Sequence, residues 1–268
     1  MRKSLLQALG PPLVAALLLA GLIALGRAAR DALRPQDRYA VAFGDLDCEP
    51  PPGEERAAFL GEVQYLAGLP ERLPVLDEEL PARLAEAFAR HPWVEKVERV
   101  EVVPPGRVRA RLTYRTPVLA VVLHGQAQDG RAVDRDGILL PAGAPLAGLP
   151  IFYAVAPPPA GPAGSPWGDK AVEAAARTAA YLAPYRQPLP FEDFDVTDGG
   201  LVLSQPPSVR VRWGHAPGAE AADEAPAAKK VQRLLDYCKE HGGLGLPEPQ
   251  EHDVRPKGQA VHRPAPKS

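Results

Sequence analysis

The sequence predicts an α+β fold, with two domains behind an apolar N-terminal helix. Its 268 residues exceed the usual size of a single domain, and its 33 prolines and 24 glycines indicate several turns and linkers. Stretches with helical periodicity and stretches with two-residue alternation follow one another along the chain. An uncharged stretch near the N-terminus is the third observation, because it is long enough to form a membrane helix.

The N-terminal anchor is expected over residues 1–30, and a polar spacer follows over 31–38. No charged residue lies between Lys3 and Arg27, and a helix of that length can cross the hydrocarbon core. A Pro-Pro pair interrupts the stretch, and the shorter run behind it is also typical of a cleavable signal peptide. An uncleaved anchor is favoured, because prolines are tolerated in membrane helices. A cleaved signal peptide would instead leave a secreted, soluble binding protein.

The first domain is expected over residues 39–117, in the order strand, helix, helix, strand, strand. Alternating apolar residues predict the first strand at 39–43. Apolar residues at helical spacing predict helices at 54–69 and 80–91, and a proline follows each helix and ends it. Two helices on one face of a three-stranded sheet are therefore expected.

The last two strands of this domain form an antiparallel pair. Residues 94–103 are rich in β-branched side chains, and a Pro-Pro-Gly turn leads into strict alternation from Arg107 to Arg115. The arginines of this alternation should face solvent and pair with glutamates on the neighbouring strand. Trp93, at the corner before that strand, should be buried. The apolar side chains expected to pack together are Phe59, Leu66, Leu84, Phe88, Val108 and Leu112.

The second domain is expected over residues 118–255 and is rich in short strands. Its expected elements are an apolar strand at 118–123, a stretch at 133–140 that folds back at the Asp136-Gly137 turn, an alanine-rich helix at 169–182, three short strands between 191 and 213, and a last helix ended by Gly242 and Gly243. A stretch dense in proline and glycine, residues 156–168, reads as a loop or linker.

A set of short motifs occurs in the order and spacing of a known module. His91-Pro92-Trp93-Val94, a Pro-Gly turn, the run from Tyr114 to Val118, and the run from Val133 to Pro141 resemble the POTRA module of the FtsQ/DivIB bacterial cell division proteins. The residues that carry this signature are His91, Pro92, Trp93, Val94, Arg115, Thr116, Pro117, Asp134 and Gly137. The resemblance covers residues 39–150 well and the remainder loosely.

The resemblance implies a POTRA domain of order β-α-α-β-β, followed by an FtsQ-like β-domain. It also implies a single-pass protein of the inner membrane with a cytoplasmic N-terminus and an exported body, acting as a division scaffold without catalysis. The alternative is a POTRA-bearing envelope transport or assembly factor, for which tandem POTRA repeats would be expected.

The C-terminal residues are similar to the closing hairpin of the FtsQ β-domain, where the family binds FtsB/FtsL partners by strand addition. Residues 256–268 are accordingly expected to form an edge segment and a flexible tail. Pro256 departs from the pattern, because proline removes a donor from the strand ladder. The resemblance implies the partner-binding residues Val254, Arg255, Gln259, Ala260 and Val261.

No catalytic or cofactor site is expected in this sequence. The six histidines are scattered, and neither cysteine lies in a CxxC motif, so no enzyme activity, cofactor or metal site is predicted. A net charge of −2 with interspersed charges argues against nucleic-acid binding, and no small-molecule substrate is expected. Cys48 and Cys238 could pair as a disulfide or stay as two separate buried thiols.

Overall fold

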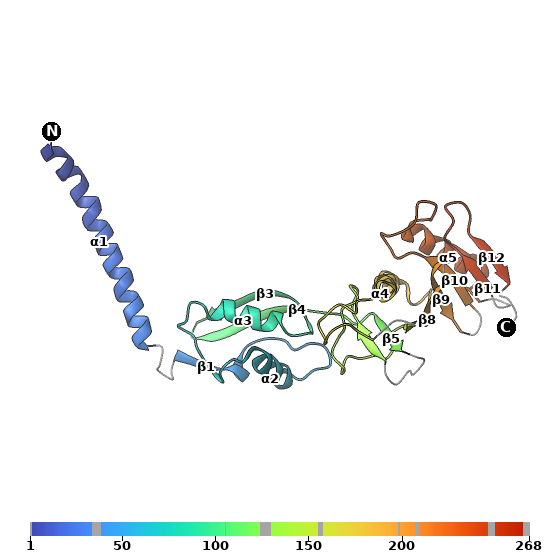
Figure 1. Ribbon diagram of the computed structural model, residues 1–268, viewed down its shortest axis with the longest axis horizontal. Coiled ribbons are helices and arrows are strands. Elements are labelled where there is room, and N and C mark those ends of the chain that lie inside the picture. Colours follow the sequence, from blue (N-terminus) through green and yellow to red (C-terminus); the bar gives the residue numbers. More distant parts are fainter. Residues whose placement is uncertain are drawn as a thin grey trace. The chain divides into compact units, whose positions relative to one another are not determined.

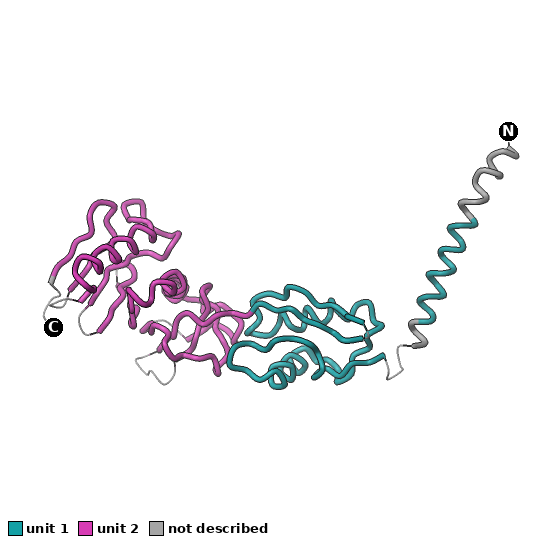
Figure 2. The backbone as a smooth tube through the Cα atoms, turned by 180° about the vertical axis from the view of Figure 1, so that it is seen from behind, with its two compact units in different colours: residues 1–113 teal, residues 114–268 magenta. Residues whose placement is uncertain are grey.

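The computed structural model describes residues 2–33, 39–104, 106–123, 130–154, 158–197, 199–206, 209–245 and 250–264. The chain divides between Thr113 and Tyr114 into two compact units, which are coloured separately in Figure 2. Two small sheets with helices make up the folded part of the first unit, and an eight-stranded sheet with helices makes up the second. The expected α+β class is therefore confirmed.

The N-terminal helix α1 extends from Arg2 to Leu33 (Figure 1). Its large apolar side chains from Val14 to Leu25 are exposed. Within the described part of the chain, no helix has both the length and the apolar character needed to cross a membrane. The expected transmembrane helix is thus not confirmed by the structure, and residues 34–38 of the expected spacer lie outside the described residues.

The first unit contains two helices and four short or medium strands after α1. They are β1 (Ala40–Ala42), η2 (Phe43–Asp45), α2 (Arg56–Ala67), β2 (Arg72–Pro74), α3 (Leu80–Ala89), β3 (Val94–Val103) and β4 (Arg107–Tyr114). Gly68 ends α2 with a left-handed φ of 61°, a conformation that glycine adopts without strain. Pro81 lies in the first turn of α3, where a missing N–H costs no helical hydrogen bond.

The expected three-stranded sheet is replaced by two separate pairs. β1 pairs antiparallel with β2, and β3 pairs with β4. The three-residue strand β2 was not predicted, because no alternation in the sequence indicates it. The segment after β1 reaches β4 through a parallel bridge between Asp47 and Arg109. The Asp47 amide donates to the Val108 carbonyl (2.9 Å), and the Ala110 amide donates to the Asp47 carbonyl (2.9 Å). Asp47, rather than β1, therefore occupies the third position beside β4.

The core of the first unit is close to the expected one. Phe59, Leu84, Phe88, Trp93 and Val108 are all buried. Leu66 is an error of prediction: it lies in the last turn of α2, beyond the buried stretch of that helix, and is 50% exposed. Leu112 is half-buried.

The ion pairs of the arginines at β4 differ from expectation, and Arg115 pairs with Asp134 of the second unit. Arg109 pairs with Asp47 (Nε to Oδ2, 3.0 Å), not with a glutamate of β3. Glu98 on β3 accepts hydrogen bonds from Thr113 (3.1 Å) and Lys96 (2.7 Å). The bridge between Asp47 and β4 explains the change, because it places a carboxylate directly beside the Arg109 side chain.

Both cysteines carry free thiols. Burial raises the pKa of the Cys48 thiol to about 11, and burial likewise raises the pKa of Cys238. A disulfide between them is not formed in this structure.

The second unit is built on an eight-stranded mixed sheet (Figure 1). Its elements are β5 (Leu119–Leu123), β6 (Arg131–Val133), β7 (Ile151–Ala154), α4 (Lys170–Leu182), η4 (Ala183–Tyr185), β8 (Asp193–Thr197), β9 (Gly200–Gln205), β10 (Val209–Gly214), α5 (Ala227–His241), β11 (Gln250–Asp253) and β12 (Val261–Pro264). The strand order is β12-β11-β10-β9-β8-β7-β5-β6. The pairs β5–β7, β7–β8 and β10–β11 are parallel, and the others are antiparallel.

One hydrophobic core serves the whole second unit. Alternate residues of β9 and β10 share a buried cluster with side chains from both α4 and α5, so both helices pack on the same face of the sheet. Asp169 caps α4, because its carboxylate accepts the amide of Ala171 (2.6 Å). Trp167 and Trp213 lie fully inside this core.

Candidate functional site

The large sheet has two edges, and one of them is covered. At the β6 edge the Leu140 amide donates to the Ala132 carbonyl (2.9 Å), so the chain returning from the next turn lies along the strand. A further loop covers that return: the Gly164 amide donates to the Leu139 carbonyl (2.7 Å), and the Leu139 amide donates to the Ser165 carbonyl (2.9 Å). The β6 edge therefore offers no free ladder for another strand.

The other edge is β12, which pairs antiparallel with β11. The Val254 amide donates to the Arg212 carbonyl of β10 (3.3 Å), which shows that the backbone groups of Val254 and His252 face β10. The direction of the backbone N–H and C=O groups alternates along a strand. Those of Glu251 and Asp253 therefore face β12, where these residues pair with Arg263 and Val261. The backbone N–H and C=O of His262 then face outward. No strand of the described residues pairs with them.

The segment that connects β11 to β12 is held by α5. Arg233 donates from Nη1 to the carbonyls of Val254 (2.8 Å) and Pro256 (2.7 Å). Its Nη2 donates to the Lys257 carbonyl (3.2 Å) and also contacts the Gly258 carbonyl. A guanidinium has five N–H donors in a rigid plane, so one side chain can fix several carbonyls at once. Arg233 thereby positions the hairpin that carries the edge.

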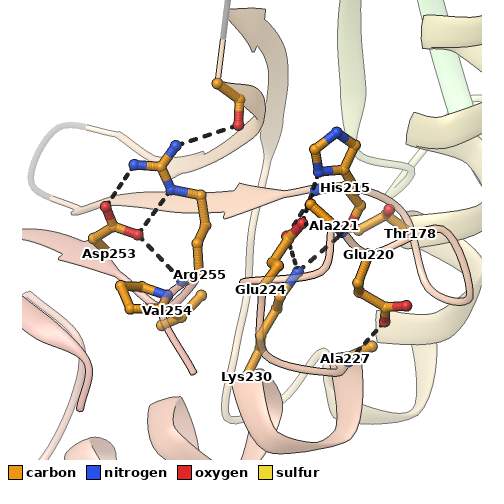
Figure 3. A network of polar contacts seen from close by, with 12 residues as sticks. Thr178, His215, Glu220, Ala221, Glu224, Ala227, Lys230, Asp253, Val254 and Arg255 are labelled. Carbon is orange, nitrogen blue, oxygen red and sulfur yellow. Dashed lines mark hydrogen bonds and ion pairs between the residues drawn. The ribbon is translucent and has the colours of Figure 1, made fainter. Parts of the chain in front are cut away.

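A buried ion pair holds the loop before α5 (Figure 3), and this loop contacts the same segment, because the Lys257 amide donates to the Asp223 carbonyl (3.2 Å). Lys230 of α5 is fully buried and contacts the Glu224 carboxylate and the His215 carbonyl (3.4 Å). Glu224 also accepts the amides of His215 (2.9 Å) and Ala221 (3.1 Å) and the ring Nδ1 of His215 (2.6 Å). Burial would raise the pKa of Glu224, but these hydrogen bonds outweigh it and hold the pKa below its usual range.

The Lys230–Glu224 pair was not predicted from the sequence. A usable signal existed, since Lys230 lies at helical spacing with the buried residues Ala227, Val231 and Leu234 of α5. A lysine in an apolar stripe requires a buried partner, and Glu224 lies in the loop immediately before the helix.

The expected partner-binding residues are divided between core and surface. Val254 is fully buried, so its side chain is part of the hydrophobic core and not available to a partner. Arg255 is half-buried and pairs with Asp253 (Nη2 to Oδ2, 2.6 Å). Gln259 is exposed, Ala260 packs partly against the core, and Val261 begins β12 with 37% of its surface exposed. Of the five, Val261 lies in β12 itself, and Gln259 and Ala260 lie in the chain that leads into it.

The described residues contain no group of three or more His, Cys, Asp or Glu side chains able to hold a metal ion.

The ion pair between Asp253 and Arg255 stabilises the end of β11 (Figure 3). Burial opposes ionisation of Asp253, but the hydrogen bonds from Arg255 outweigh it, and the pKa of Asp253 is lowered.

Comparison with known proteins identifies a protein of similar sequence. No family model matches the chain. Over 167 residues the chain is 33% identical to the cell division protein FtsQ of Rhodothermus marinus. The chain is therefore similar in sequence to an FtsQ-type cell division protein. The match spans 59% of this chain and 59% of the length of that FtsQ.

The FtsQ-like motifs of the first unit form a packing corner. His91 is buried, and the Trp93 amide donates to its Nδ1 (3.3 Å), so the ring proton lies on Nε2 and is donated to Glu62 (3.1 Å). Burial lowers the pKa of His91, although Glu62 opposes the shift. Pro92 is half-buried, and Trp93 and Val94 are buried beside it. These four residues therefore act in folding, as a corner between α3 and β3.

The FtsQ-like motifs of the second unit converge on one carboxylate. Asp134 is buried and pairs with Arg115 (Oδ2 to Nη1, 2.6 Å), while its Oδ1 accepts the amides of Asp136 and Ile138, both at 2.9 Å. Gly137 has a φ of 73°, and a Cβ there would lie 3.0 Å from Glu173. Thr116 is exposed and Pro117 half-buried in the link to β5.

Proposed function

We propose that this chain is a membrane-anchored, non-enzymatic scaffold of bacterial cell division that binds other division proteins at the outer edge of β12. The sequence kinship with FtsQ supports the cell-division role. The observation that carries the binding proposal is the free edge of β12, on which the His262 N–H and C=O face away from the sheet.

Strand addition fits this edge better than the opposite one. A partner strand would gain main-chain hydrogen bonds to β12, and alternate exposed side chains would supply specificity. Val261 and Arg263 are exposed there, whereas the β6 edge is already covered by the chain's own return. Strands of FtsB-like or FtsL-like proteins are the proposed occupants, as the resemblance to the FtsQ family implies.

The test is the substitution His262→Pro, compared with His262→Asn. Proline removes the outward N–H, and the backbone of residue 262 makes no ladder hydrogen bond to β11. Losing one hydrogen bond and leaving the partner's acceptor unpaired should weaken binding by about tenfold, or about 1.4 kcal/mol. The measurement is the dissociation constant for purified FtsB-like and FtsL-like proteins of the same cell, at pH 7.5.

His262→Asn is the matched control, because it retains the backbone N–H and a side-chain donor near the position of Nδ1. Its affinity should stay within about twofold of the unchanged protein. Equal affinities for the proline and asparagine variants would show that partners bind elsewhere, and the edge proposal would fail.

We also propose that α1 anchors the chain in the inner membrane as a single span, with the N-terminus in the cytoplasm and the body exported. The support is its run of exposed leucine, isoleucine and valine side chains, which favour an apolar surrounding. Deleting residues 2–33 should move the protein from the membrane fraction to the soluble fraction of lysed cells. Recovery of the shortened chain in the membrane fraction, at the level of the unchanged chain, would contradict an anchor in α1.

A further inference from the structure

Four aromatic rings meet at the hairpin that carries the β12 edge. His252 of β11 and His262 of β12 are direct cross-strand neighbours, and their Nδ1 atoms are 2.7 Å apart. Tyr237 of α5 lies against both rings, at 4.6 Å between centroids in each case. His241, one turn further along α5, stacks on Tyr237 at 4.1 Å. Three histidines on three elements therefore share one small cluster.

The hydrogen bonds determine where the protons lie. His252 is fully buried, and its Nε2 is 3.0 Å from the Leu244 carbonyl, which can only accept, so Nε2 carries a proton. In the neutral ring the Nδ1 of His252 is then an acceptor. His262 must therefore donate from its own Nδ1. The pair is satisfied when His252 is neutral and His262 holds a proton on Nδ1.

This arrangement tolerates one extra proton but not two. A proton added to Nε2 of His262 leaves the bond between the two Nδ1 atoms intact. A proton added to Nδ1 of His252 would place two N–H groups against each other across 2.7 Å, and would also put a charge in the core of the sheet. The cross-strand contact then breaks, and β12 loses its attachment beside α5.

The charged groups around the cluster do not compensate for such a charge. On α5 the neighbours are Tyr237, His241 and Glu240, and of these only Glu240 favours the protonated form of His262. Glu251 and Asp253 point to the opposite face of β11 and pair with Arg212 and Arg255. On β10 the residue opposite His252 is the apolar Val211, and Arg263 lies on the other face of β12.

We propose that this histidine cluster makes the docking edge sensitive to acid, so that β12 stays in the sheet when the cluster is neutral and detaches when His252 and His262 are both protonated. The proposal deepens the strand-addition function and rests on it for its biological meaning. Partner binding at β12 would then be lost at mildly acidic pH.

The direction of the pH dependence follows from the two histidines. Burial lowers the pKa of His252 and of His262 from the ordinary 6.5; the charge of His241 lowers both further, and the charge of His252 also lowers the pKa of His262. Once β12 detaches, both rings regain the ordinary pKa and bind more protons, so acid favours the detached state. The attachment of β12 is complete above pH 6.5 and weakens as the pH falls below that value.

The test is amide hydrogen exchange of β11 and β12 in the full chain, solubilised in mild detergent, without any partner. After correction for the intrinsic pH effect, protection of the Val261 and Arg263 amides, which face β11, should fall about tenfold between pH 7.5 and pH 5.5. Protection of β8 and β9 should change by less than about twofold over the same range. An unchanged protection of β12 would overturn the proposal.

Two variants separate the histidine pair from other effects of acid. In His262→Asn one titrating group is gone and the amide can rotate to accept from a protonated His252, so the loss should shrink to about threefold. Arg263→Gln, on the same strand but the opposite face, should retain the full tenfold loss. A His262→Asn variant with the unchanged loss, or an Arg263→Gln variant without it, would also overturn the proposal.

Partner binding at pH 7.5 is measured separately, with the FtsB-like and FtsL-like proteins. Absent binding at that pH together with acid-sensitive exchange would refute the docking function and leave the switch standing. Normal binding together with acid-insensitive exchange would refute the switch and leave the docking function standing.

Discussion

Replacing Lys230 by alanine should destabilise the second unit by about 3 to 5 kcal/mol, the range for breaking a buried ion pair from one side. The ammonium group is fully buried and contacts the Glu224 carboxylate. Without it, a carboxylate that is itself almost fully buried would retain only the hydrogen bonds from His215 and Ala221. The loss should therefore exceed the removal of the methylene stem alone.

The measurement is urea unfolding followed by tryptophan fluorescence, with Trp213 as the natural reporter because the Lys230 ammonium lies 4.9 Å from its ring. Lys229→Ala is the matched control: this residue is adjacent on α5, exposed, and donates only to the Lys257 carbonyl (3.0 Å). Its effect should stay below about 1 kcal/mol. Equal and small effects of the two substitutions would mean that the Glu224 network adds nothing to stability.

Trp93→Ala should destabilise the first unit by about 3 to 5 kcal/mol, the usual loss on emptying a large buried aromatic site. Trp93 is only 2% exposed, and its amide fixes the ring of His91 through a 3.3 Å hydrogen bond. The substitution would open a cavity at the corner where α3 leads into β3. Its indole Nε1 has no hydrogen-bond partner among the described residues, so the expected loss is one of packing.

Arg109→Ala provides the comparison in the same unit. Its ion pair with Asp47 is exposed, and such pairs contribute about 0 to 1 kcal/mol. Urea melts that monitor the first unit, by exchange of β3 and β4 amides, should separate the two variants clearly. If Trp93→Ala proved as mild as Arg109→Ala, Trp93 would not be a core residue of this unit.

Elements with long or strict patterns were predictable from the sequence. The periodicity of α3 and the alternation of β4 identified both elements and their buried faces. The strands β2, β7 and β11 were missed, because three or four residues carry too little pattern to separate a strand from a loop. The pairing of strands across the large sheet could not be predicted either, because it joins residues far apart in sequence.

For the candidate site, the sequence predicted a closing hairpin but not the orientation of its residues. The resemblance to FtsQ directed attention to the closing hairpin, but it placed the buried Val254 among the contact residues. His262, whose backbone faces outward, was not singled out, because the direction of a backbone group depends on strand register. The role of Arg233 could not be predicted either. Its partners are backbone carbonyls, and every residue has one, so the sequence does not indicate which of them it binds.

The parallel pairing of β10 with β11 has a consequence for the edge at β12. Parallel neighbours need a crossover connection, and here that connection contains α5, so the position of β11 in the sheet depends on this helix. Among the described strands, β12 in turn pairs only with β11, so it is the outermost strand and depends on β11 for its attachment. If partners bind at β12 as proposed, the docking edge exists only in chains whose α5 and β11 are already in place.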